Sequence, residues 1–137
     1  TPFNENNPAF SPDGHWIAYH TDESGRREVR VVAFPPKGDN WQISTAGGIQ
    51  PTWRADGREL YFLAPDGTLM AVDVRPGAIF EWGEARPLFK TRLNITPNME
   101  QYTPAPDGNR FLLVVPDSDG SSAPFTIVLN WTALLEK

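Results

Sequence analysis

A seven-residue pattern ending in Asp-Gly occurs three times in the chain, and it constrains the fold more than any other feature. The three segments are Pro8–Gly14, Pro51–Gly57 and Tyr102–Gly108. Their spacing of roughly 40 to 50 residues is a period typical of repeat architectures. Asp bonds to a turn backbone and Gly adopts a positive φ, so each segment predicts a tight β-hairpin.

Each hairpin is followed by a nearly continuous apolar run, which is typical of a strand that is covered on both faces. These runs are Ile17–Tyr19, Leu60–Leu63 and Phe111–Val115. A second turn then leads to a strand with alternating apolar and polar residues. These alternating strands are Glu28–Ala33, Leu69–Val74 and Phe125–Asn130, with fourth strands predicted at Trp41–Ser44 and Pro87–Lys90. The segment Gly77–Trp82 is an insertion in the second repeat.

Units of this length with about four strands each predict an all-β fold made of β-propeller blades. An ordinary antiparallel sandwich is the alternative, but three aligned double hairpins favour the propeller. We expect residues 1–137 to form one propeller segment of about three four-stranded antiparallel blades. The blades are predicted at about 7–45, 50–91 and 100–131, and a strand at 1–4 completes the last.

The first repeat resembles the repeat of TolB-type, WD40-like β-propellers. Phe10–Tyr19 has an aromatic residue, Ser-Pro-Asp-Gly, two variable residues and Ile-Ala-aromatic. The second repeat departs from this pattern with Arg54-Ala55, and the third has Pro104 in place of the aromatic residue. The ending Ile127–Trp131 is similar to C-terminal propeller regions of large bacterial proteins, including some serine/threonine kinases. This resemblance implies the fold and an extracytoplasmic, periplasmic location, but no ligand.

The strand count predicts that one chain does not close a ring, because closed propellers have four to eight blades. The segment around Phe3 is expected to be a strand of a preceding blade, before a loop at Asn4–Asn7. We therefore expect a homo-oligomer, a dimer closing as a six-bladed ring. Its closure residues are Phe3, Ile127, Leu129 and Trp131. The alternative is that the chain is a fragment of a longer propeller, and the sequence leaves both open.

The net charge, the lengths of the apolar runs and the few Cys and His residues argue against several classes of function. The net charge of −5 does not fit a duplex-binding surface, so no nucleic-acid partner is expected. No apolar run approaches the roughly 20 residues of a membrane-spanning helix, so membrane insertion is not expected. With zero Cys and two His, we predict no catalytic constellation, no metal site and no cofactor. His15 and His20 are expected at the surface or at hairpin ends.

A binding surface is predicted from topology, because loops between second and third strands emerge on the same face as loops joining blades. These loops are Asp22–Arg26, Gly47–Gln50, Pro65–Thr68, Leu93–Gln101 and Asp117–Ala123. Long loops on a rigid scaffold often carry function, so the longest one supplies the candidate residues. They are Asn94, Asn98, Met99 and Glu100. Trp16 is a further candidate, since its equivalents Glu59 and Arg110 are polar and predict an exposed ring.

Two classes of function fit these features. The first is a non-enzymatic interaction or scaffold module that binds a protein or peptide through loops on one face of the ring. The second is a propeller that serves as an accessory to, or a fragment of, an enzyme (a hydrolase or a kinase-linked sensor), or that binds carbohydrate. Clustered polar groups with shifted pKa values around the channel would favour the enzyme.

Overall fold

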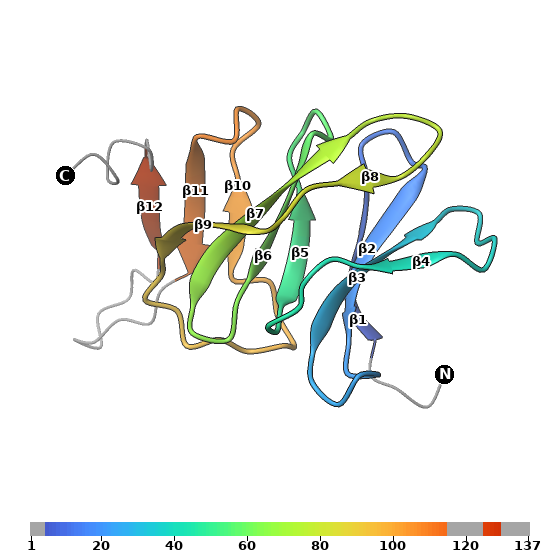
Figure 1. Ribbon diagram of the computed structural model, residues 1–137. Coiled ribbons are helices and arrows are strands. Elements are labelled where there is room, and N and C mark those ends of the chain that lie inside the picture. The colour runs from blue at the N-terminus through green and yellow to red at the C-terminus, as the bar shows by residue number, and fades with distance from the viewer. Residues whose placement is uncertain (1–4, 115–124, 130–137) are drawn as a thin grey trace.

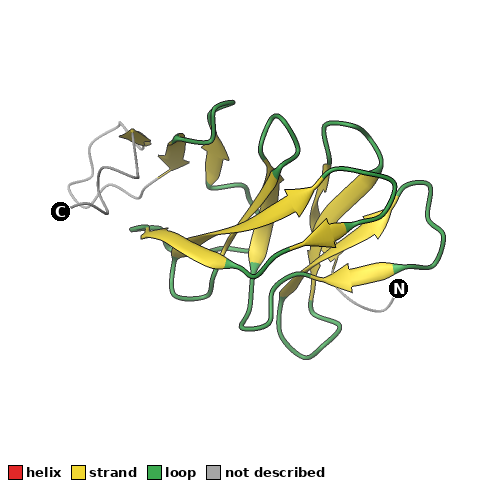
Figure 2. Cartoon of the chain, turned by 45° about the horizontal axis from the view of Figure 1, so that its top comes forward, coloured by secondary structure: helices red, strands yellow, loops and turns green. Residues whose placement is uncertain are grey.

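The chain folds into three antiparallel sheets that follow one another in sequence and in space (Figures 1 and 2). The computed structural model describes residues 5–114 and 125–129, and these residues contain strands and loops but no helix. The all-β blade architecture predicted from the sequence is therefore confirmed.

The sheets are built from consecutive strands. The first contains β1 (Glu5–Phe10), β2 (Trp16–Thr21), β3 (Glu28–Ala33) and β4 (Asn40–Gln42). The second contains β5 (Ile49–Trp53), β6 (Glu59–Leu63), β7 (Thr68–Arg75), β8 (Glu81–Trp82) and β9 (Arg86–Lys90). The third contains β10 (Tyr102–Pro104), β11 (Arg110–Val114) and β12 (Phe125–Leu129).

The Asp-Gly pairs form the β1–β2, β5–β6 and β10–β11 turns, as predicted. The carboxylates of Asp13, Asp56 and Asp107 each accept a hydrogen bond from the backbone N–H two residues later, at 2.9–3.0 Å. The glycine of each pair has a φ between 71° and 75°, a conformation that costs little only without a side chain. The recurring motif thus builds the fold.

The start of the first strand differs from the expectation. Asn4–Asn7 was predicted as a loop, but β1 begins at Glu5, which pairs with Thr21, and Asn6 pairs with His20. The register then shifts before Ala9, where Asn7 has a φ of 53°. The β-bulge absorbs the irregularity and lets polar residues continue the strand.

The insertion in the second repeat adds a short strand. The long strand β7 pairs with β9 along residues 68–71 and with β8 at Val74 and Arg75. The predicted strand 1–4, together with Phe3 and Trp131, lies outside the described residues. Ile127 and Leu129 lie on β12, opposite Leu112 and Arg110, and their role in ring closure stays a prediction.

Two hydrophobic cores lie between the sheets, one on each face of the second sheet. Leu60 and Phe62 face the first sheet, whereas Tyr61 and Leu63 face the third. All four side chains are at most 2% exposed. This confirms that the apolar run in the second repeat is a strand covered on both faces. Among the described residues, no helix could cross a membrane.

Candidate functional site

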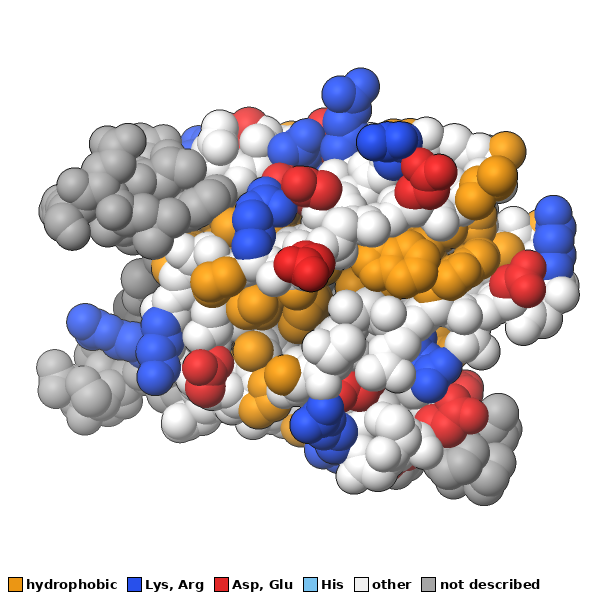
Figure 3. All heavy atoms as spheres, in the orientation of Figure 1, with side chains coloured by type: hydrophobic (Ala, Val, Ile, Leu, Met, Phe, Trp, Pro, Cys, Tyr) orange, Lys and Arg blue, Asp and Glu red, His pale blue; other side chains and the backbone are white. Residues whose placement is uncertain are grey.

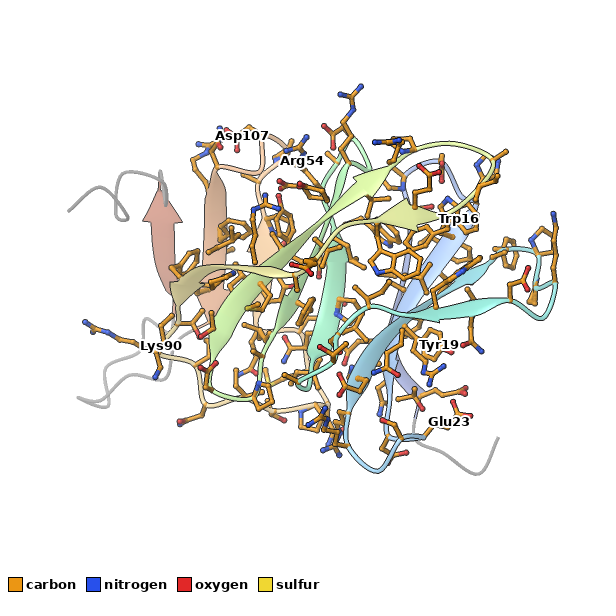
Figure 4. The ribbon with its side chains drawn as sticks, viewed as in Figure 1. Trp16, Tyr19, Glu23, Arg54, Lys90 and Asp107 are labelled. Atoms are coloured by element: carbon orange, nitrogen blue, oxygen red, sulfur yellow. The ribbon has the colours of Figure 1, made fainter. Side chains whose placement is uncertain are left out.

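Four connections meet at one end of the sheets, at the bottom of Figure 1, and we call this end the loop face. They are the β2–β3 turn, the β4–β5 connection, the β6–β7 turn and the long β9–β10 loop. In a run of antiparallel strands, alternate connections lie at the same end. The Asp-Gly hairpins therefore lie at the opposite end, where Figure 4 shows Asp107 and Arg54.

A buried carboxylate holds the β4–β5 connection in place. Glu28 is 1% exposed and accepts hydrogen bonds from the Gly47 N–H, from the Ser44 hydroxyl and, at 2.6 Å, from Arg26 Nε. The Arg26 guanidinium also donates to the Thr45 carbonyl. Because several donors satisfy this buried charge, its position is well defined, and the connection is fixed with it.

Two buried glutamines hold the long β9–β10 loop. The Gln50 side chain donates to Gln101 Oε1 at 2.9 Å and to the Thr96 carbonyl at 2.8 Å, and it accepts from the Gln101 N–H at 2.8 Å. The Gln101 amide in turn donates to the Asn94 carbonyl and accepts from the Thr96 N–H. These bonds fix the loop backbone and tie the second sheet to the third. We call this pair of side chains the amide clasp.

A cleft of about 340 Å3 opens between these fixed connections. Its apolar walls come from Ile49, Leu63, Pro65, Ile95 and Pro97, together with Gly47 and Gly48. Arg26 and Arg27 are the charged side chains that line it. Arg27 is exposed and forms no ion pair with any residue in the described part of the chain. The cleft therefore offers an apolar pocket beside a free guanidinium.

His20 lies fully buried in the first sheet, close to this end. The Gln50 N–H donates to its Nδ1 at 3.3 Å, while its Nε2 finds no hydrogen-bond partner among the described residues. Burial, reinforced by the charge of Arg27, lowers the pKa of His20 to about 4. His20 is therefore neutral near pH 7. It lies at the β2–β3 hairpin end, one of the two predicted positions, but it is buried and not at the surface. His15 is exposed beside Asp13, as expected.

The residues predicted on the long loop are exposed but do not line the cleft. Asn94, Asn98, Met99 and Glu100 all face solvent, and Met99 is 49% exposed. The loop instead contributes Ile95 and Pro97 to the cleft. The predicted loops do share one end of the sheets, but the sequence prediction named polar residues of the long loop and not the apolar Ile95 and Pro97 that line the cleft. A role for the four exposed residues in recognition stays a prediction.

Trp16 is buried, so the expectation of an exposed ring is wrong. Only 7% of the residue is accessible, and Figure 4 places it beside β8. Its ring contacts Trp41 at 5.7 Å and Phe80 at 5.3 Å between ring centroids. Phe80 belongs to the insertion of the second repeat, which folds over the first sheet. Alignment to polar equivalents failed because the residue that covers this ring, Phe80, comes from an insertion in the next repeat.

In a cluster of charged side chains at the hairpin end, the charges pair with one another. Glu59 accepts hydrogen bonds from Arg86 at 2.7 Å and from the Tyr61 hydroxyl at 2.6 Å, and its carboxylate lies 3.5 Å from Arg54. Burial, together with the nearby Glu59, raises the pKa of Tyr61. Because each charge has a partner of opposite sign, the cluster fastens β5, β6 and β9 together. Within the described ranges, no group of His, Asp and Glu could hold a metal ion.

Comparisons with known proteins identify the fold family that this chain resembles. No family model and no curated protein matches the sequence. A solved structure of a TolB candidate from Agrobacterium tumefaciens matches 93% of this chain with a TM-score of 0.59 and 18% sequence identity. The fold is that of a TolB-type β-propeller.

This chain covers 44% of that TolB-type structure, so it spans less than half of its length. TolB from Acinetobacter baumannii matches with a TM-score of 0.45 and 18% identity, over 93% of this chain and 41% of that one. The first of these matches supports the TolB-type fold alone, which was predicted from the repeat, and the predicted link to kinase-associated proteins stays untested.

Proposed function

We propose that this chain is a non-enzymatic interaction module of an extracytoplasmic propeller, and that it binds a protein or peptide segment at the loop face. The cleft there carries the proposal. It is built from four separate connections, and buried hydrogen bonds hold two of them, the β4–β5 connection and the β9–β10 loop, so much of its shape exists before a partner arrives. A preformed site loses little conformational freedom on binding.

The lining of the cleft indicates which segment it would accept. The walls suit an apolar side chain, and Arg27, which has no ion-pair partner among residues 5–114 and 125–129, suits a carboxylate next to it. Arg26 already pairs with Glu28, so in this chain of net charge −5 it is Arg27 that presents a positive charge to the cleft. The proposed partner therefore displays an apolar residue beside an acidic one.

Selection from a random dodecapeptide library on the full chain tests this function. We expect enriched peptides to pair apolar with acidic residues, and Arg27→Glu to weaken their binding at least about tenfold, because it replaces attraction by repulsion. Arg58→Glu, an equal charge reversal at the hairpin end, is the matched control and should leave the affinity unchanged. Failure to enrich any peptide, or equal effects of the two variants, would contradict the proposal.

We also propose that a second copy of the chain packs against the outer face of the first sheet, as ring closure requires. Ile17, Tyr19 and Val32 lie partly exposed on this face, beside a cleft of about 640 Å3. Their equivalents in the second sheet are Leu60, Phe62 and Val72, at 0%, 2% and 0% exposure beneath the first sheet. The repeat thus places blade-packing residues on a face that is open in one chain. Light scattering should give twice the mass of one chain, and the mass of a single chain would contradict the dimer.

A further inference from the structure

A third cleft lies at the hairpin end, away from the loop face, and the insertion of the second repeat forms one of its walls. Its volume is about 630 Å3, within the roughly 300–1,000 Å3 of ordinary small-molecule sites. The walls are residues 73–76 of β7 and its continuation, residues 81–83, which include β8, and Arg58. No part of the loop-face cleft is shared with it.

Trp82 is the aromatic residue that lines this cleft, and Phe80 packs against one face of its ring. It stacks on Phe80 with ring centroids 5.3 Å apart and an interplanar angle of 26°. Phe80 is itself 4% exposed and contacts Trp16, Trp41 and Trp53. Trp82 remains 38% exposed, and Figure 3 shows a hydrophobic patch between β8 and β4, next to the cleft. A flat ring that is fixed and yet open is a ready stacking platform.

The charged groups around Trp82 largely neutralise one another. Glu81 lies 3.3 Å from Arg75, and Asp73 accepts a hydrogen bond from Arg86 at 2.8 Å. The guanidinium of Arg58 forms no hydrogen bond or ion pair with the described residues, and it is exposed. The cleft wall therefore presents both hydrogen-bond donors and acceptors, without a strong field of either sign.

We propose that this cleft binds a neutral saccharide whose pyranose ring lies on Trp82. A pyranose with equatorial hydroxyls has an apolar face of C–H groups, which suits an indole, and a rim of hydroxyls that both donate and accept. The carboxylates of Asp73 and Glu81 would accept from that rim, and Arg58 would donate to it. A purely apolar ligand would offer nothing to the Arg58 guanidinium or to the exposed carboxylate oxygens, and a strongly charged ligand would meet both signs.

Titration of the full chain with three neutral hexasaccharides, cellohexaose, N-acetylchitohexaose and maltohexaose, tests the proposal. We expect at least one to bind saturably by calorimetry and to shift the Trp82 indole N–H resonance. Trp82→Ala should weaken that binding at least about tenfold, since it removes the stacking surface, whereas Trp82→Phe should retain most of it.

Ile79→Ala supplies the matched control, because Ile79 lies on the same insertion, is 74% exposed and does not line the cleft. Its affinity should equal that of the unmodified chain. The proposal is overturned if none of the three probes saturates at millimolar concentration, or if Trp82→Ala binds as well as Ile79→Ala. Tighter binding of a sulfated glucan hexamer or of hexalysine would also overturn it, because either result would make charge the basis of recognition.

Discussion

Two glycines with the same backbone conformation provide a direct test of how tightly the loop face is packed. Gly47 has a φ of 95° and Gly25 a φ of 93°, so an alanine is strained equally at both. A Cβ on Gly47 would lie 2.4 Å from Cγ of Pro65, whereas a Cβ on Gly25 would meet no atom within 4 Å. The pair therefore separates crowding from backbone strain.

The expected magnitudes follow from these contacts. Both substitutions place a side chain at a left-handed φ, which costs about 1–2 kcal/mol. Gly47→Ala must also displace the Pro65 ring, and overpacking of this kind adds about 1–3 kcal/mol. We expect Gly47→Ala to lower the free energy of unfolding by about 2–5 kcal/mol and Gly25→Ala by about 1–2 kcal/mol.

Urea denaturation of the two variants measures this difference, provided that the dependence on denaturant stays the same. Because Gly47 and Pro65 both line the loop-face cleft, Gly47→Ala should also weaken the binding of selected peptides. Equal losses of stability at the two glycines would refute the close approach of the β4–β5 connection to the β6–β7 turn.

Two further predictions concern side chains whose burial was unexpected. The folded chain keeps the pKa of His20 near 4, below its ordinary value of 6.5, so falling pH favours the unfolded state, which takes up the proton first. Stability should fall by about 2 kcal/mol from pH 7.5 to 5 in denaturation series, and His20→Leu should remove this loss while His15→Ala keeps it. Trp16→Ala should cost about 3–5 kcal/mol in the same assay, because its ring is buried, and Trp82→Ala should cost less than about 2 kcal/mol. A smaller effect at Trp16 than at Trp82 would refute the aromatic cover.

The blade pattern could be predicted because it rests on local rules. An Asp-Gly turn needs only its own residues, and an apolar run such as Leu60–Leu63 indicates burial wherever it packs. The loop face followed from the same pattern, since alternate connections of a meander share one end. None of these inferences required knowledge of which side chains meet across sheets.

The details of the sites depend on contacts between repeats, and these are not local. Trp16 was expected at the surface because the partner that covers it, Phe80, comes from an insertion in the next repeat. Nothing in the sequence around Trp16 indicates a contact with Phe80, which lies far from it along the chain. Arg27 and the apolar lining of the cleft were missed for the same reason.

The amide clasp did leave a signal in the sequence. Asn7, Gln50 and Gln101 occupy the same position of the three repeats, just before the apolar or aromatic residues of each first strand. Asn7 and Gln50 both have positive φ values, 53° and 55°, at equivalent β-bulges. A recurring amide at a repeat boundary predicts a polar link between neighbouring blades, and only the choice of partner needs the structure.

The insertion that carries Phe80 changes the order in which the blades are expected to unfold. In most repeat proteins each unit contacts its neighbours through standard faces, and units are lost from the ends one at a time. Here a residue that belongs to the second sheet by sequence completes the first core in space. Opening the second blade would uncover Trp16 and with it the interior of the first, so we expect these two blades to behave as a single cooperative unit in hydrogen exchange and proteolysis.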